Sequence, residues 1–436
     1  MLRPAPTLAL AWTLGAMAGL ASVLSAGAAV VLPTIAAALA IPTLLSVWVI
    51  SGFSLAYAVS MAAYGRLADV YGLRAPLVAG TVLMAIGSLV AALAPNFAVL
   101  MVARIAQGVG GAAVPVLGVA IITSFRDPVL STKGLALVTG LSSLGAGTGA
   151  LVGGTVESLS SWRVALGVPA LSVALLLWIW RVLPTQRAKT TMDFTGALLV
   201  TALASGVILL AQAASTGLTV AVVGGVLVLI TVPSLVQWVR SHPDGFLPKS
   251  VIANRIVRLV VISSTAVPIA WFSLLAAVPI ATHEMQWSPI QTGLALAPSG
   301  VIGFLSARRS ARVIARHGAH WTLRLSVALA AIALAVSATG VRFGIPLLTA
   351  MGVWFVTAGF GMAQPAMVTA INAEIDGATR GVALGTAIMV TFASGAFGAA
   401  AIGGFSDLIG IDGVLVGLEL FAVISLIAIQ RVRASR

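Results

Sequence analysis

Few side chains in this 436-residue chain could carry a proton, hold a metal ion or act on a substrate. The sequence contains 11 acidic residues, 4 histidines and no cysteine, which excludes disulfides, thiol catalysis and cysteine metal sites. The histidines do not have the spacing of a metal site, and the sequence has no glycine-rich phosphate-binding loop. We therefore expect no catalytic residue, no metal and no cofactor, and neither an enzyme nor an ATP-driven pump.

The most distinctive polar residues stand inside apolar stretches. Arg104 and Gln107 are three positions apart, so a helix would place them on one face. An arginine in apolar surroundings usually faces a cavity or a polar partner, although it can also extend to the nearest surface. Glu157 and Arg163 are a second group, which could titrate or form a structural ion pair. These four residues are our candidates for a polar cavity or for proton coupling.

The composition indicates which elements must position these residues. The chain is 60% apolar and 8% charged, with a mean hydropathy of +1.11, whereas soluble domains carry about 25% charged residues. A water-soluble protein is therefore excluded, and a polytopic membrane protein is predicted. The net charge of +13 does not indicate a nucleic-acid partner, because basic residues collect in the cytoplasmic loops of membrane proteins.

Fourteen apolar segments come close to the length of about 20 residues that crosses a bilayer as a helix. We therefore predict an all-α polytopic membrane protein with fourteen transmembrane helices, built from two six-helix bundles (1–185 and 246–436) and two inserted helices (186–245). The segments are 8–32, 43–64, 76–95, 97–123, 134–157, 163–182, 194–214, 217–239, 258–281, 289–307, 321–341, 344–371, 381–405 and 411–430.

The basic residues favour one orientation of these segments. With the N-terminus inside, all of the 24 lysines and arginines except Arg104, Arg163 and Arg342 fall on the inner side. This asymmetry is the usual signature of cytoplasmic loops. We expect a multi-pass protein of the inner or plasma membrane with both termini in the cytoplasm.

One stretch is repeated weakly along the chain. Residues 65–74 (GRLADVYGLR) correspond to residues 311–320 (ARVIARHGAH), 246 positions later, with Asp69 replaced by Ala315. Such internal repeats are common in transporters, where the substrate path lies between the two copies. The repeat therefore favours a transporter built from two related halves.

Four stretches resemble motifs of the major facilitator superfamily, and specifically of its fourteen-helix drug:proton antiporter branch. They are the loop motif at 65–74, the stretch from Arg104 to Ala112, the glycines of the fifth predicted helix, and the Ser-Trp-Arg stretch that begins at Ser161. The resemblance implies a secondary transporter that exchanges drugs for protons by alternating access.

Two positions depart from the family pattern. Ala150 replaces the proline of the antiporter motif, so the expected kink in the fifth helix is weaker. Leu24 stands where members of the branch usually carry a carboxylate in the first helix. Since no other carboxylate stands out as the proton carrier, proton coupling stays open at this point.

The loop motif predicts a conformational latch made of Gly65, Arg66, Asp69, Gly72 and Arg74. The carboxylate of Asp69 could accept hydrogen bonds from the positive N-terminal end of the helix near Gly381 and hold the two halves together on the inner side. The alternative is a charge cluster that only fixes the topology.

The fifth predicted helix carries a face of small residues. Gly145, Gly149 and Gly153 recur every four residues and are followed by Gly154. This spacing lets helix backbones approach closely and is common in membrane packing. Together with the other motifs, it indicates a gating helix.

The substrate cavity is expected to be apolar or weakly polar, with candidates Trp48, Trp271, Trp354 and Gln364, although tryptophans more often pack or lie at the interface. Such a lining favours lipophilic compounds with few charges. We predict proton-coupled efflux of amphipathic small molecules or drugs, with protons and the lipid bilayer as further partners. An uncoupled facilitator, or a non-transporting sensor or partner protein on the same fold, remains the alternative.

Overall fold

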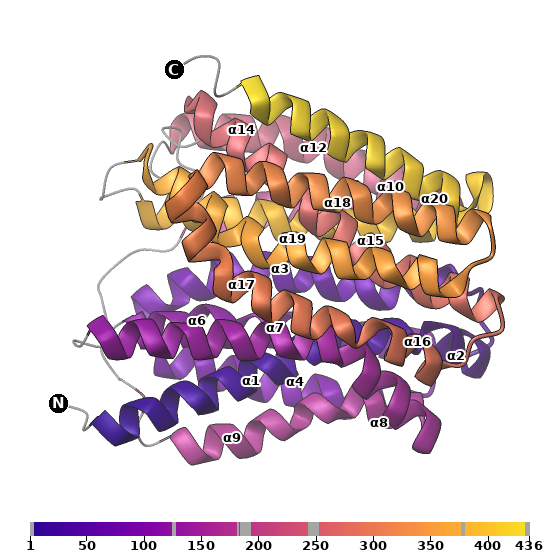
Figure 1. Ribbon diagram of the computed structural model, residues 1–436, viewed down its shortest axis with the longest axis horizontal. Coiled ribbons are helices and arrows are strands. Elements are labelled where there is room, and N and C mark those ends of the chain that lie inside the picture. The colour runs from indigo at the N-terminus through magenta and orange to yellow at the C-terminus, as the bar shows by residue number, and fades with distance from the viewer. Residues whose placement is uncertain are drawn as a thin grey trace.

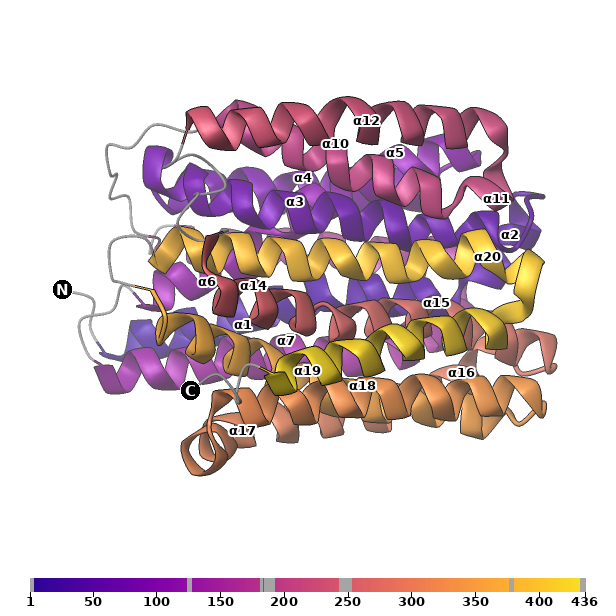
Figure 2. The ribbon, with the colours of Figure 1, turned by 90° about the horizontal axis from the view of Figure 1, so that it is seen from above.

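The computed structural model describes residues 4–123, 128–180, 183, 193–242, 253–375 and 380–431, and the regular elements in these ranges are all helical. The long helices run roughly along one axis (Figure 1). The start of α1 and the end of α20 lie toward the same end of this bundle (Figures 1 and 2), which we call the terminal end.

The first half of the chain forms long helices separated by short turns, and its longest helix is α7. Their bounds are α1 Pro4–Val30, α2 Leu32–Ala38, α3 Trp48–Tyr71, α4 Arg74–Leu93, α5 Phe97–Gly111, α6 Ala113–Thr123, α7 Pro128–Leu159, α8 Trp162–Gly167 and α9 Ser172–Ile179. Short 3₁₀ turns at Leu45–Val47 and Val168–Leu171 lead into α3 and α9.

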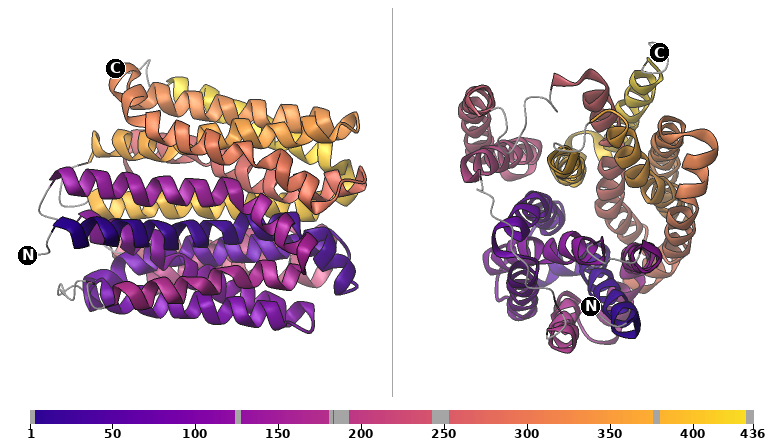
Figure 3. Two further views of the ribbon diagram at one scale, coloured as in Figure 1. Left: turned by 60° about the horizontal axis from the view of Figure 1, so that its bottom comes forward. Right: turned by 90° about the vertical axis from the view of Figure 1, so that its left-hand side faces the viewer.

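The remaining helices begin with α10 and α12, which pack against each other at the edge of the molecule (Figure 3). Their bounds are α10 Phe194–Ala211, α11 Ala213–Thr216, α12 Leu218–Ser241, α14 Arg255–Ser264, α15 Ala266–Glu284, α16 Pro289–Leu296, α17 Pro298–His317, α18 Ala319–Arg342, α19 Pro346–Asn372 and α20 Arg380–Arg431. Most of the α12 side chains are exposed, as expected for a helix that faces lipid.

The number of candidate spans differs from the prediction. Twelve helical segments among the described residues are long and apolar enough to cross a membrane, so the prediction of fourteen is wrong. The predicted segment 194–214 corresponds to α10, a helix of 18 residues that is not among these twelve. The predicted segments 381–405 and 411–430 both lie in α20, whose two helices meet at a kink at Gly410 (φ 77°, ψ 159°), and this element accounts for one of the twelve.

The repeated stretch forms the same kind of turn in both places. Gly72 ends α3 with φ 79° and Gly318 ends α17 with φ 87°. The backbone N–H of each glycine donates to the carbonyl four residues earlier, on Ala68 (2.9 Å) and Ile314 (2.8 Å). A positive φ is available to glycine without steric cost, so both glycines stop a helix at equivalent positions of the two halves.

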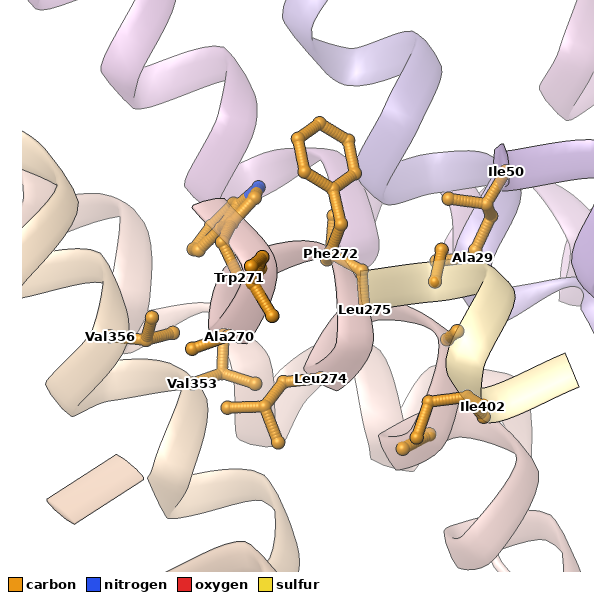
Figure 4. Packing of buried hydrophobic residues seen from close by; sticks show 14 of the residues in the cluster. Ala29, Ile50, Ala270, Trp271, Phe272, Leu274, Leu275, Val353, Val356 and Ile402 are labelled. Carbon is orange, nitrogen blue, oxygen red and sulfur yellow. The ribbon is translucent and has the colours of Figure 1, made fainter. Parts of the chain in front are cut away.

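The core is centred on α15, whose residues from Ala266 to Thr282 are all buried. Figure 4 shows Trp271, Phe272 and Leu275 of this helix pointing in different directions, with Val353 and Val356 on one side of the helix and Ala29, Ile50 and Ile402 on the other. The buried cluster also includes Val353 of α19 and residues of α1, α3 and α20. A helix that is apolar on every side needs such surroundings, and α15 thus joins the early and late parts of the chain.

Candidate functional site

Arg104 is completely buried in α5 and is held by neutral hydrogen-bond acceptors. Its Nε donates to the carbonyl oxygen of Val49 on α3 at 2.8 Å, and its Nη1 donates to Oε1 of Gln107 at 2.8 Å. The three-residue spacing noted in the sequence therefore brings these two side chains into direct contact. The arginine does not extend to the surface.

Gln107 extends this network to two further helices. Its Nε2 donates to the hydroxyl oxygen of Ser88 on α4 and to the carbonyl oxygen of Leu166 on α8, both at 3.0 Å. Ser88 in turn donates to the carbonyl of Met84 at 2.8 Å. All of these side chains are buried, and satisfied buried networks of this kind fix the positions of the helices they join.

The guanidinium group of Arg104 retains one unused donor. Its Nη2 is buried and has no hydrogen-bond partner, and no described carboxylate forms an ion pair with the group. The ring of Phe53 lies against the guanidinium carbon, with 4.3 Å from that carbon to the ring centroid. A buried cation without a counter-ion is costly, and Nη2 is the donor of this group that no described residue satisfies.

From Phe53, a continuous chain of ring contacts crosses the molecule. Phe53 stacks on Tyr57 of α3 with centroids 5.7 Å apart, and Tyr57 contacts Phe392 of α20 at 5.9 Å. Phe392 meets the edge of Phe360 on α19 at 6.0 Å, and Phe360 contacts Trp271 on α15 at 5.6 Å. We call these five residues the aromatic chain. It links a helix of the first half with three helices of the second.

Sequence reasoning identified only Trp271 of this chain. The other four are phenylalanine or tyrosine residues in apolar helices, a context that is equally typical of side chains facing lipid. Nothing in the local sequence marks them. Their contact can be seen only in the folded structure, because Tyr57 and Phe392 are 335 positions apart in the sequence.

The other predicted cavity residues do not join the aromatic chain. Trp48 packs against a small cluster formed by α10 and α20. Trp354 donates from Nε1 to the carbonyl of Ala295 at 2.8 Å and so ties α19 to α16. Gln364 is exposed. Two tryptophans therefore have packing or bridging contacts in this structure.

Glu157 and Arg163 are not paired with each other in the structure. Glu157 Oε1 accepts a hydrogen bond from the hydroxyl of Thr34 at 3.2 Å. Arg163 donates to the carbonyl of Ala94 and lies over the ring of Trp162, with its guanidinium carbon 4.3 Å from the centroid. The ion pair considered from the sequence is therefore absent between these two described residues.

The structure describes part of the predicted latch. Gly72 makes the turn described above, and Arg74 lies over the ring of Trp180, 4.3 Å from its centroid. A Cβ atom on Gly65 would meet no neighbour within 4 Å. The side chains of Arg66 and Asp69 and the surroundings of Gly381 lie outside the described residues, and so does the side chain of Leu24.

The glycines of α7 serve two different contacts. Gly145, Gly149 and Gly153 face α1, where a Cβ atom on Gly153 would lie 2.5 Å from the carbonyl oxygen of Gly27. This predicted face therefore packs two helices of the same half together.

The contact between α7 and the second half uses other glycines. A Cβ atom on Gly154 would lie 2.5 Å from the carbonyl oxygen of Pro289 on α16, and one on Gly147 would overlap the Cα of Gly300 on α17. The sequence analysis included Gly154 but missed Gly147, which falls outside the four-residue spacing. Gly147 and Gly154 thus lie between the two halves.

Comparisons with known proteins place this arrangement in a family. The model of the Major Facilitator Superfamily matches residues 13–399. The cephamycin export protein CmcT of Amycolatopsis lactamdurans is 28% identical over 66% of this chain and 62% of that protein. The lincomycin resistance protein of Streptomyces lincolnensis is 29% identical over 69% of this chain and 64% of that protein. The matches thus span slightly less than two thirds of these two relatives.

Solved structures give the same fold. The xylose transporter XylE of E. coli, in a partially occluded inward-open conformation, superposes with a TM-score of 0.64 at 14% identity and covers 97% of both chains. A POT family transporter in complex with 5-aminolevulinic acid gives a TM-score of 0.73 at 12% identity, over 96% of this chain and 94% of that one. At such low sequence identities, these two structures support a shared fold and nothing more. With the family model covering most of its length, the chain belongs to the Major Facilitator Superfamily and is a multi-span membrane transporter.

Proposed function

We propose that the protein exports lipophilic small molecules and works by alternating access between two six-helix bundles, residues 1–185 and 246–436. In this proposal both termini are cytoplasmic, the membrane is the inner or plasma membrane, and proton entry drives export. Several relatives support the direction of transport, since their names describe export of an antibiotic or resistance to one.

The observation that carries the substrate class is the aromatic chain beside Arg104. Its five rings come from helices of both halves, so a ligand that replaced one ring contact would touch both moving parts. Aromatic faces bind apolar and π-rich molecules without demanding a particular hydrogen-bond pattern. The buried Nη2 of Arg104 adds one polar anchor. Planar lipophilic compounds with at most one acceptor group near the ring fit this chemistry.

The proposed proton site is Glu157. The buried Arg104 has no carboxylate partner among the described residues, and Leu24 cannot titrate. Glu157, whose carboxylate is half-buried and bonded to Thr34 of α2, is the candidate that could exchange a proton as the halves move. Facilitated transport without protons remains the second candidate, because the first-helix carboxylate of the branch is missing.

Energised inverted membrane vesicles test the function. We expect that adding a planar lipophilic dye to vesicles containing the protein alkalinises the lumen, as read by an internal pH probe. Vesicles with the Glu157→Gln variant should accumulate less dye and show no pH response. Dye equilibration without a pH change would establish the uncoupled facilitator. No protein-dependent dye movement, across a panel of such compounds, would contradict the proposed transport.

The latch gives a prediction of its own. Asp69→Asn should lower transport about tenfold at unchanged expression, because a neutral amide interacts more weakly with a helix N-terminus than a carboxylate does. The readout is initial dye efflux per molecule of protein. Asp193→Asn is the matched control, since Asp193 caps α10, where its Oδ1 accepts from the N–H of Gly196 at 2.8 Å, and its carboxylate also accepts from Nε1 of Trp238 on α12 at 3.2 Å. Unchanged transport in Asp69→Asn would leave topology as its only role.

A further inference from the structure

Three arginines at the terminal end of α17 share one exposed face. Arg308, Arg309 and Arg312 are all exposed, and together with Leu305 they line a hollow of about 210 Å³. Their positions, together with Leu305 one or two turns earlier, fall within a single helical stripe. The hollow therefore combines three cationic groups with one apolar wall.

This stripe points away from the protein. The opposite side of α17 packs on α19, where a Cβ atom on Gly303 would lie 2.7 Å from the methyl group of Thr357. The stripe continues toward the membrane interior through Leu305 and Val301, which are 38% and 56% exposed. Exposed apolar side chains on a membrane-spanning helix face acyl chains. The three arginines lie next along the helix, at the edge of this lipid-facing surface.

The three arginines have no polar partner in the part of the chain that the structure describes. Among the described residues, none of the three forms an ion pair or a side-chain hydrogen bond. The internal repeat explains part of this, because Ala315 occupies the position that Asp69 holds in the first copy. Trp321, partly exposed and stacked on His317 with ring centroids 4.5 Å apart, lies on the next helix just beyond. Tryptophan at this level is typical of the membrane–water interface.

We propose that this face binds the headgroup of an anionic phospholipid of the inner leaflet, with its phosphate among Arg308, Arg309 and Arg312 and an acyl chain along Leu305 and Val301. Guanidinium groups bind phosphate oxygens in a bidentate manner. A soluble phosphate would bind to the arginines but would make no contact with Leu305 and Val301, so it should bind more weakly than the lipid. The proposal does not depend on the transported substrate.

The test measures lipid retention by native mass spectrometry of the purified protein, with phosphatidylglycerol and phosphatidylcholine of matched chains. We expect one phosphatidylglycerol to remain bound in preference to phosphatidylcholine. The triple variant Arg308→Gln, Arg309→Gln and Arg312→Gln should bind it about a hundredfold more weakly, given the contribution of each basic residue near an anionic surface. Soluble glycerol 3-phosphate at the same concentration should not be retained.

Two further variants make the result specific. The control triple variant Arg240→Gln, Arg255→Gln and Arg258→Gln removes the same charge from exposed positions near the same end of the molecule, and it should keep the lipid. Replacing Arg308, Arg309 and Arg312 by lysine preserves the charge that fixes topology and should weaken binding several-fold through lost bidentate contacts. Equal loss in both glutamine variants, retention in both, or retention of glycerol 3-phosphate would overturn the proposal.

Discussion

Replacing Arg104 with methionine should abolish transport and leave the fold intact. Methionine fills most of the same volume without charge, and exchanging a buried charged group for an apolar one is often neutral for stability. The variant removes the polar group beside Phe53 and the donor to Gln107. We expect export to fall at least about a hundredfold, as for the loss of a buried charge contact worth about 3 kcal/mol. Dye accumulation in inverted vesicles gives the rate, and the melting temperature of purified protein reports the fold.

Arg104→Ala should fail in a different way. Both variants remove the bonds to Val49 and Gln107, but alanine also leaves a cavity that methionine fills, so we expect a loss of about 3 kcal/mol in stability in addition to the loss of transport. Arg342→Met is the control. Arg342 is exposed and lies 3.9 Å from the carboxylate of Asp412, so its replacement should leave both measurements nearly unchanged. Wild-type export by Arg104→Met would remove Arg104 from the site and leave it a structural role.

Arg104 could be identified from the sequence because the energetic cost of placing a cation in an apolar segment depends only on the local sequence. A cation inside an apolar segment needs a partner wherever the segment goes, and Gln107 on the same helical face supplies that partner. Its remaining contacts, to Val49 and through Gln107 to Leu166, come from other helices. The sequence therefore predicted the residue and its nearest partner, and tertiary packing determined the rest.

The aromatic chain shows the opposite case. Phe53, Tyr57, Phe360 and Phe392 satisfy the same hydrophobic requirement whether they face lipid or each other, so their local sequence carries no information about the contact. Only the arrangement of α3, α15, α19 and α20 brings them together. A single sequence does not determine which helices become neighbours in such a bundle.

The helical nature of the chain could be predicted from the sequence, because the length of an apolar segment is a local property. The number of membrane spans could not. Apolar length defines where a helix can exist, and a glycine with a positive φ can mark where one ends. Gly72 ends α3, and two helices within α20 meet at Gly410, which has a similar φ. The predicted segment 194–214 extends beyond the end of α10 at Ala211, where the buried side chain of Gln212 donates a hydrogen bond to Ser51.

Enlarging Gly147 should shift the protein toward the conformation that opens away from the terminal end. Gly147 of α7 and Gly300 of α17 touch through their backbones, and this contact holds the two halves together away from the terminal end. A leucine there forces the helices apart, at a cost of about 1–3 kcal/mol to the closed state. The ratio of open to closed molecules should therefore rise about tenfold or more, with transport slowed because one state is disfavoured.

The chain has no cysteine, so this shift can be measured without altering native residues other than the labelled ones. Spin labels on Leu159→Cys and Phe343→Cys, which are 82% and 72% exposed near the ends of α7 and α18, should report a longer distance in Gly147→Leu than in the parent. Gly147→Ala should give an intermediate distribution. Gly225→Leu is the control, because a Cβ atom there meets nothing within 4 Å. If the distances in Gly147→Leu match those of the control, the two halves do not separate at this contact.

Because Gly145, Gly149 and Gly153 pack within one half, leucine at those positions should lower the melting temperature of the protein without lengthening the distance between the two spin labels.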